Sequence, residues 1–353
     1  MKKILFLIFC SQIFGGCKDK ENIPALLPVD DFVIKGADLS YLPEIRTSGL
    51  LFYNQQKQTE DMLLTLKNAG VNTIRLRLWK NPTTPNSNFE TVKKLVQEIK
   101  SLGLKTLLTV HYSDTWADPS QQTKPQQWQG ISFNQLKDSV YAYTQKITTE
   151  INPDYIQIGN EINHGLLWPD GEITRLEQMK SLLQSGISAV RANNKNIKII
   201  IHHAGLQHAP WFYQQVANLD FDWIGISYYP MWHGKSLDSL QQTLTTLSTT
   251  HQKPVFIAET SYPFTLEWND WTNNIIGLDS QLIAAYPPTP IGQKDYLLRI
   301  QHLLKNVPNA IGFCYWGAEW VSYKGNQATN GSTYENQAFW DFKREALPVL
   351  DAY

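Results

Sequence analysis

The sequence predicts a single (β/α)8 barrel, a TIM barrel, over residues 32–353, and two observations support this fold class. Eight short apolar runs, rich in β-branched and aromatic residues, recur along the chain, and longer amphipathic segments separate them. The composition shows no break that would divide this length into two domains. A doubly wound sheet is the alternative, but no Gly-x-Gly-x-x-Gly turn follows the first expected strand.

The eight expected strands are bounded by glycine, proline or polar residues, and they lie at 33–38, 72–79, 104–111, 154–161, 197–203, 221–228, 254–259 and 310–316. Apolar residues at helical spacing predict helices between them, including 59–69, 89–102, 133–150, 174–192 and 291–306. Gly70 and Gly103 follow the first two of these helices, where glycine is typical of a helix end.

Composition gives no support to a nucleic-acid-binding protein and only modest support to a carbohydrate-binding one. The 31 basic and 32 acidic residues nearly cancel, so no basic surface for nucleic acid is expected. Twelve tryptophans and sixteen tyrosines offer flat apolar faces that suit sugar rings, although aromatic residues also fill cores. The three cysteines provide no disulfide framework, and Cys314, within an apolar strand, is expected to be a small buried core residue.

The N-terminus resembles an export signal. Lys2 and Lys3 precede an apolar run that is too short to span a bilayer, which predicts a signal peptide over 1–17. The stretch 14–17 is similar to a bacterial lipobox, so Cys17 is the expected lipidation site and 18–31 a tether. We therefore expect a membrane-anchored lipoprotein at the cell surface or in the periplasm; Phe14 is unusual in such a motif and keeps plain secretion as an alternative.

Two glutamates carry the functional prediction. Glu161 and Glu259 end the expected strands four and seven, and strand ends of this kind meet at the C-terminal rim of a barrel. Paired carboxyls at that rim are how retaining glycosidases supply an acid/base and a nucleophile. Asn160 precedes the first glutamate, where a neutral amide would bond the sugar 2-OH. The sequence therefore predicts a sugar-cleaving enzyme.

The other strand ends identify a family. The runs HYSDTWADP at 111–119, GNEINHGLLWPDG at 159–171, IGISYYPMWHG at 224–234 and the pattern YW-x-x-x-W at 315–320 resemble the glycoside hydrolase family 53 endo-β-1,4-galactanases. The resemblance covers the whole barrel. It implies a retaining double displacement on β-1,4-galactan, the galactose side chains of pectin (type I arabinogalactan), with Glu161 as acid/base, Glu259 as nucleophile and no metal or other cofactor in catalysis.

Further substrate-binding residues are expected around these glutamates. Arg75, with Tyr228 as a second donor, is expected to keep Glu259 ionised, unless it serves only as a core ion pair. Trp316 is expected to floor the subsite of the reacting sugar. The remaining candidates are polar residues that could contact hydroxyls or orient the cluster, and tryptophans that could stack on neighbouring sugars or anchor loops: Asp38, His111, Asp114, Trp116, Trp232, His233 and Trp320.

Two metal interpretations are weaker. His202, His203 and His208 are expected to be hydrogen-bonded rim residues, because metal-dependent barrel hydrolases place His-x-His after strand one and this chain has Gly-Ala-Asp there. Structural calcium is possible in the loops after strands seven and eight, with oxygens from Asp270, Asn326 and Asn330, although no Asp-x-Asp spacing is present.

The sequence departs from the family pattern at two places, and two other functions are alternatives to a galactanase. Gly317 stands where the family has glutamate, and Glu319 is a possible substitute; the stretch 264–290 matches nothing familiar and could reshape distant subsites. The rivals are another endo-β-glycanase of the same barrel clan, acting on mannan, xylan or β-glucan, and a non-catalytic surface glycan-binding lipoprotein. We expect a monomer whose only membrane contact is the lipid.

Overall fold

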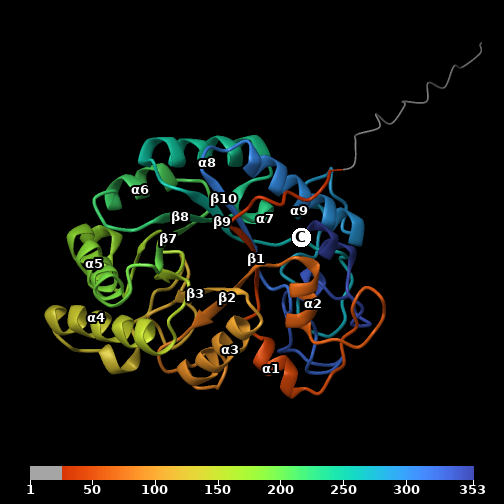
Figure 1. Ribbon diagram of the computed structural model, residues 1–353, viewed down its shortest axis with the longest axis horizontal. Coiled ribbons are helices and arrows are strands. Elements are labelled where there is room, and N and C mark those ends of the chain that lie inside the picture. The colour runs from red at the N-terminus through yellow and green to blue at the C-terminus, as the bar shows by residue number, and fades with distance from the viewer. Residues whose placement is uncertain (1–25) are drawn as a thin grey trace, which may run out of the picture.

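The structure is a computed structural model that describes residues 26–353, and it confirms the predicted (β/α)8 barrel (Figure 1). Eight parallel strands close in the order β1-β10-β9-β8-β7-β4-β3-β2. Their bounds are β1 Ile34–Asp38, β2 Thr73–Leu78, β3 Lys105–Val110, β4 Tyr155–Ile158, β7 Lys198–Ala204, β8 Trp223–Ser227, β9 Val255–Thr260 and β10 Ala310–Tyr315. The expected signal peptide, Cys17 and most of the tether lie outside the described residues.

Helices surround the barrel, as parallel strands require a crossover connection between them. They are α1 Leu42–Thr47, α2 Met62–Ala69, α3 Phe89–Ser101, α4 Phe133–Glu150, α5 Leu176–Asn193, α6 Ala209–Val216, α7 Pro230–His233, α8 Leu237–His251 and α9 Pro290–Lys305. Gly70 ends α2 with φ 107°, and Gly103 follows α3 with φ 79°, which confirms both predicted helix ends. A two-stranded antiparallel pair, β5 Gly165–Leu166 and β6 Gly171–Glu172, lies after β4.

The barrel closes between the first and last strands. At Gly312 of β10 φ is +132°, and a Cβ atom there would lie 1.8 Å from the Ile34 carbonyl oxygen of β1. Only glycine therefore allows these strands to approach. The C-terminus strengthens the closure, because the Tyr353 hydroxyl donates to the Gly36 carbonyl and Lys35 Nζ donates to the Tyr353 carbonyl at 2.6 Å.

The barrel interior is apolar at one end and polar at the other. A small cluster that includes Ile34, Leu107, Ile200 and Phe256 fills the N-terminal end, and a larger core lies between the strands and the helices. The inward-facing residues nearer the C-terminal ends of the strands are charged or amide side chains. Burying such groups is costly unless they bond one another, so this layer marks the candidate functional site.

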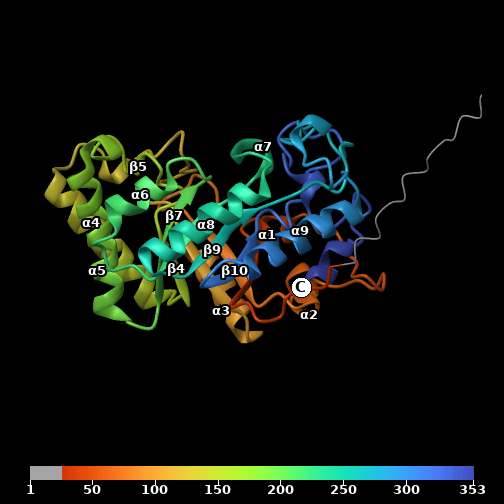
Figure 2. The same cartoon turned by 90° about the horizontal axis from the view of Figure 1, so that it is seen from above.

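Two long loops rise above the C-terminal rim on the same side of the barrel as α7 (Figure 2). They follow β9 and β10, and they pack against each other: Asn336 Nδ2 donates to the carbonyls of Thr265 and Ile276, and the Trp271 N–H donates to the Ala328 carbonyl. The unfamiliar stretch 264–290 is therefore one half of a paired-loop wall. Among residues 26–353, no helix has the length and apolar character to cross a bilayer.

Candidate active site

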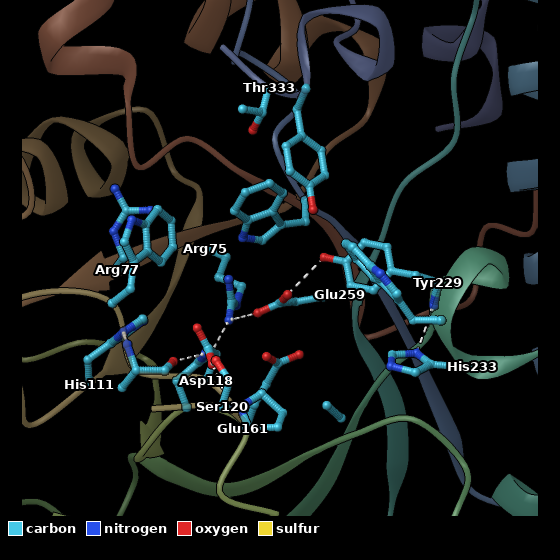
Figure 3. Close-up of a pocket in the computed structure, with 18 of the residues that line it drawn as sticks. Arg75, Arg77, His111, Asp118, Ser120, Glu161, Tyr229, His233, Glu259 and Thr333 are labelled. Atoms are coloured by element: carbon cyan, nitrogen blue, oxygen red, sulfur yellow. Dashed lines mark hydrogen bonds and ion pairs between the residues drawn. The ribbon is translucent and has the colours of Figure 1, made fainter. Parts of the chain in front are cut away.

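A pocket of 770 Å³ opens at the C-terminal ends of the strands (Figure 3). Glu161 and Glu259 face each other near its centre, with Arg77 on one side and His233 on the other. Most strands contribute at least one side chain to the pocket or to the layer directly beneath it. This is the rim at which barrel enzymes place their catalytic groups.

The separation of the two glutamates fits one class of reaction. One carboxylate oxygen of Glu161, one of Glu259 and a ring nitrogen of His202 all lie within 4.8 Å of one another. Retaining glycosidases hold their carboxyls about 5–5.5 Å apart, whereas inverting enzymes need about 6.5–9.5 Å to admit a water molecule. The pair is therefore close enough for direct nucleophilic attack.

Glu161 lies in a turn beyond β4, not on the strand that the sequence predicted. The strand ends at Ile158, and then Gly159 has φ 88° and Glu161 itself has φ 46°. A Cβ at position 159 would lie 2.6 Å from Cγ2 of Ile162, so a larger residue would displace the turn. Left-handed backbone at a non-glycine residue is uncommon and concentrates at functional sites.

Glu259 is held by two donors. Arg75 Nη2 lies 2.5 Å from its Oε1, and the Tyr229 hydroxyl donates to its Oε2 at 2.8 Å. The predicted ion pair with Arg75 is thus confirmed, but the prediction for Tyr228 is wrong, because its hydroxyl donates to the Gly234 carbonyl. Alternation explains the difference: Ser227 points into the barrel interior beneath the pocket, so residue 228 faces away and residue 229 faces in again.

Glu161 has a different partner, the hydroxyl of Ser227, whose Oγ donates to Glu161 Oε1 at 2.5 Å. His202 Nε2 lies 2.8 Å from the same Oγ, and its Nδ1 lies 2.8 Å from Nε2 of Gln157. The Gln157 amide donates to Nδ1, which places the imidazole hydrogen on Nε2 and directs the serine hydrogen to the carboxylate. Gln157 and Ser227 were not among the residues predicted from the sequence; inward alternation along β4 and β8 is the signal that points to them.

These different environments give the carboxyls of Glu161 and Glu259 different pKa values. Burial in the pocket, with the adjacent charge of Glu259, raises the pKa of Glu161 to about 8. Burial also raises the pKa of Glu259, but the Arg75 charge and the Tyr229 hydrogen bond oppose that rise. At neutral pH the proton therefore resides on Glu161 and the negative charge on Glu259. This is the division of labour that a retaining mechanism requires.

Arg75 is the hub of the polar layer. Its Nη1 pairs with Asp38 Oδ2 at 2.8 Å, its Nη2 reaches Asn160 Oδ1 at 3.1 Å, and its Nε reaches Gln157 Oε1 at 3.2 Å. Asp38 is buried beneath the guanidinium and does not line the pocket, so it orients Arg75. Asn160 does line the pocket, and its Nδ2 donates to the Ala117 carbonyl at 2.8 Å, which fixes the amide.

Three of the predicted tryptophans line the pocket as platforms or walls. Trp316 is nearly buried at its floor, with its ring centroid 4.4 Å from that of Tyr334. Trp116 covers the guanidinium of Arg77, whose Cζ lies 3.9 Å from the ring centroid. Trp232 projects from α7 with half its surface exposed. These placements suit contacts with sugar rings.

Trp320 also borders the pocket, but its ring stacks on Tyr41 at 4.2 Å and on Tyr334 at 5.5 Å between centroids. It therefore supports the aromatic wall more than it offers a face to a sugar. Glu319 does not take the place of the glutamate that Gly317 replaces. It is fully buried, and its Oε1 accepts from the Tyr41 N–H at 2.6 Å.

The residues after β3 that line the pocket are not all the ones that the sequence predicted. His111 lines the pocket and its Nδ1 accepts from the Ala117 N–H, while burial holds the pKa of the ring well below its usual range. Asp114 instead accepts from the backbone N–H groups of Asn81 and Gln126 and lies outside the pocket lining. Asp118, which was not among the predicted site residues, lines the pocket. Asp114 thus stabilises the loop.

Among residues 26–353, the three candidate histidines His202, His203 and His208 do not come together in a cluster that could share an ion. In residues 26–353, the one cluster of three or more His, Cys, Asp or Glu side chains near enough to share an ion is Glu161, His202 and Glu259, whose contacts are the hydrogen bonds and ion pair described above. His208 is exposed at the start of α6.

The oxygens suggested for calcium fit it poorly. The Asp270 carboxylate accepts from the Thr272 N–H and the Ser322 hydroxyl, and Nζ of Lys324 holds the Asn330 carbonyl at 2.9 Å. Asn326 is exposed. The Lys324 ammonium beside Asn330 would repel a cation bound at that residue.

Comparisons with known proteins agree with this geometry. Residues 34–353 match the family model described as Glycosyl hydrolase family 53. The arabinogalactan endo-beta-1,4-galactanase of Cellvibrio japonicus is 35% identical over 336 residues, covering 89% of each chain. The GH53 catalytic domain of Ignisphaera aggregans superposes with a TM-score of 0.85 at 37% identity, covering 93% of this chain and 98% of that one. A chain from a study of two fungal beta-1,4-galactanases gives a TM-score of 0.81 at 28% identity, covering 91% and 98%.

Proposed function

The chain belongs to glycosyl hydrolase family 53, and on that premise we infer that it is an endo-β-1,4-galactanase acting on galactan and the type I arabinogalactan side chains of pectin. The observation that carries this inference is the pair of carboxyls within 4.8 Å, of which Glu259 is ion-paired with Arg75, while burial and the charge of Glu259 raise the pKa of Glu161 to about 8. A protein that only bound glycans would have no use for this division of protonation states.

In the first step, a Glu259 carboxylate oxygen attacks the anomeric carbon, and the bond from that carbon to the glycosidic oxygen breaks. Glu161 transfers its proton to the departing oxygen, which leaves as a hydroxyl. The released galactan fragment carries the new hydroxyl end. Glu161 is now ionised, while the ester to Glu259 has removed the neighbouring negative charge, so the two charges never coexist.

In the second step, Glu161 accepts a proton from a water molecule whose oxygen attacks the anomeric carbon from the side that the leaving group vacated. The bond to Glu259 breaks and the carboxylate is restored beside Arg75 and Tyr229. Two inversions give net retention. Asn160, fixed by Arg75 and the Ala117 carbonyl, is placed to bond the 2-OH as positive charge develops on the ring.

The test is incubation of the purified protein, residues 18–353, with linear β-1,4-galactan and in parallel with mannan, xylan and β-glucan. Short galacto-oligosaccharides from galactan alone, with retained anomeric configuration by NMR, are expected. Release from another polymer would retain the mechanism and refute the substrate. Binding of galactan without cleavage of any polymer would favour the glycan-capture alternative and refute the enzyme.

We also propose that the chain is exported and lipidated at Cys17, which the sequence of 1–17 supports, and that it functions as a monomer. Expression of the full chain and of Cys17→Ser, followed by membrane fractionation, tests the anchor. Loss of the protein from the membrane fraction in the variant is expected. Light scattering of residues 18–353 tests the monomer.

A further inference from the structure

A row of hydrogen bonds beneath the pocket joins the two catalytic carboxyls. From Glu259 to Glu161 it runs in order through Arg75, Gln157, His202 and Ser227. We call these four linking residues the buried chain, because each is at most 2% exposed. Gln157 and His202 do not line the pocket, and neither step of the reaction uses them directly. The chemistry of each donor and acceptor fixes the direction in which these hydrogen bonds point.

The direction is set first at Arg75. A guanidinium group has donors only, so the atom of Gln157 that lies 3.2 Å from Arg75 Nε is the amide oxygen, Oε1. The Thr109 hydroxyl donates to the same oxygen at 2.9 Å. The amide nitrogen of Gln157 therefore faces His202, with Nε2 2.8 Å from the ring nitrogen Nδ1. Because an amide nitrogen only donates, Nδ1 is the acceptor.

The imidazole of His202 passes this direction on to Ser227. Burial holds the pKa of the ring well below its usual range, and the nearby Arg75, His203 and His233 act in the same sense. A neutral ring that accepts at Nδ1 carries its hydrogen on Nε2, which donates to Ser227 Oγ at 2.8 Å. The serine oxygen thus accepts from the histidine, and its own hydrogen is directed to Glu161 Oε1.

One other contact of the His202 ring favours the opposite tautomer. Asn160 Oδ1 lies 3.3 Å from Nδ1, and it would accept a hydrogen carried there. That hydrogen would also point at the Gln157 amide, whose nitrogen is a donor and lies closer, at 2.8 Å. Hydrogen bonds weaken with distance, and two donors that face each other in a buried site leave both unsatisfied. The contact with Gln157 therefore decides the tautomer.

The consequence concerns which oxygen of Glu161 carries the proton. The serine hydrogen already points at Oε1, so a proton on that oxygen would meet another hydrogen. Oε2 accepts no hydrogen bond from residues 26–353, and the carboxyl lies in the pocket opposite Glu259 (Figure 3). We propose that Gln157 and His202 are positioning residues, which hold the proton of Glu161 on Oε2, the oxygen left free to reach the glycosidic oxygen.

The proposal rests on the proposed function, because it assigns the donor atom of that same acid. Oε2 gives its proton to the leaving oxygen in the first step and takes one from water in the second, while Ser227 donates to Oε1 throughout. No proton travels along the buried chain. Its role is to keep every hydrogen bond pointing one way, starting from Arg75, the residue that also holds the nucleophile.

The tautomer of His202 is a direct test that does not depend on activity. In protein labelled with ¹⁵N-histidine, the ring signals of His202 are identified by their loss in His202→Asn. NMR at neutral pH is expected to show the hydrogen on Nε2 and an unprotonated Nδ1. A hydrogen on Nδ1 would reverse the hydrogen bonds between Gln157 and Ser227, and it would overturn the proposal.

The same variant tests the effect on catalysis. Asparagine at position 202 keeps an acceptor for Gln157 but has no donor for Ser227. His202→Asn is expected to lower kcat/KM on galactan about tenfold, an effect the size of one hydrogen bond. With dinitrophenyl β-galactobioside kcat/KM is expected to stay unchanged, because this leaving group departs without a proton. His202→Gln, whose amide nitrogen can donate to Ser227, is expected to restore most of the rate on galactan.

His203→Asn is the matched control, since His203 is an adjacent buried histidine whose ring bonds the Gly205 carbonyl and lies outside the buried chain. It is expected to keep the rates on both substrates. Equal losses on both substrates in His202→Asn would assign the residue to the fold, and an unchanged rate on galactan would show that it does not position the proton. Either result overturns the proposal. A wild type that cleaves no galactan would instead refute the proposed function, whatever the tautomer.

Discussion

At the scale of single residues, two glutamates of the same chemistry are made different by their neighbours. Glu259 receives a guanidinium and a phenol, whereas Glu161 receives only a serine hydroxyl and faces the charge of its partner. Hydrogen bonds and opposite charges favour the ionised form, and burial favours the neutral one. The neighbours of each carboxyl therefore decide its role: Arg75 and Tyr229 keep Glu259 ionised as the nucleophile, and Glu161, bonded to Ser227, serves as the acid.

This assignment predicts a bell-shaped pH dependence of kcat/KM on galactan. The active form has Glu259 ionised and Glu161 protonated. Activity falls as pH drops through the pKa of Glu259, which lies above the ordinary 4.5, and falls again as pH rises through the pKa of Glu161, about 8. A rate that stayed constant up to pH 10 would contradict the role of Glu161.

Tyr229→Phe is expected to move the acid limb of that profile to higher pH, because the lost hydrogen bond is one that lowers the pKa of Glu259. A hydrogen bond to a charged group contributes roughly 1.5–3 kcal/mol, so kcat should fall about tenfold to a hundredfold. Tyr228→Phe is the matched control, since that hydroxyl bonds only the Gly234 carbonyl. An acid limb that moved equally in both variants would disprove the distinction.

Ser227→Ala tests the other carboxyl. The hydroxyl of Ser227 lowers the pKa of Glu161, so its removal is expected to move the alkaline limb to higher pH while the acid limb stays in place. Full pH profiles of kcat/KM for the variant and the wild type provide the measurement. A shift of the alkaline limb to lower pH would mean that the serine does not donate to the carboxylate.

At the scale of elements, the strands set positions and the turns after them set directions. β4 brings the chain to the rim, but the left-handed turn at Gly159 and Glu161 aims the carboxyl across the barrel towards β9. The paired loops after β9 and β10 bring Tyr334 against Trp316. Such loops are held by side-chain to backbone bonds, not by a repeating ladder, which is why their conformations vary more than the strands.

Gly159→Ala is expected to reduce kcat far more than it reduces stability. The added Cβ would meet Ile162 at 2.6 Å, and a displacement of about 1 Å at a catalytic group costs roughly 10²-fold in rate. Gly130→Ala is the control, because Gly130 has φ +71° with nothing within 4 Å of a Cβ. Its strain should lower the melting temperature and leave kcat intact. Equal rates for both variants would show that the turn at Gly159 does not position Glu161.

At the scale of the whole molecule, the fold concentrates buried neutral histidines near one rim. Burial lowers the pKa of His111, His202, His203 and His233, so the folded protein resists protonation of all four. The unfolded chain, with pKa values near 6.5, takes up those protons more readily. Stability is therefore linked to pH on the acidic side.

Above pH 6.5, the contribution of these histidines to the free energy of unfolding is expected to be constant. As pH falls from about 6.5 towards 4 that stability is lost, because the pKa values are lowered in the folded state and only the unfolded chain gains protons in this range. For His203, a pKa of about 4 against 6.5 corresponds to about 3 kcal/mol lost at pH 4. Denaturant titrations at several pH values measure it. His203→Gln should show a shallower fall, and an identical slope would contradict the linkage.

Metal removal provides a further whole-molecule test. Because the Asp270 carboxylate is already hydrogen-bonded and Lys324 holds the Asn330 carbonyl, EDTA is expected to leave the melting temperature unchanged. Added calcium is expected to have no effect either. A rise of several degrees with calcium, reversed by chelation, would show that the loops rearrange around an ion.

The alternation of strands and helices, the barrel fold and the two glutamates at the rim could all be predicted from the amino-acid sequence. These follow from periodic patterns and from the chemistry that a strand end imposes. The tertiary structure alone decided that Tyr229 and not Tyr228 serves Glu259, that Asp118 and not Asp114 lines the pocket, and that Trp320 is covered by tyrosines. Beyond the last paired residue of a strand, side-chain direction depends on individual backbone torsions and on packing between distant loops, which no local pattern encodes.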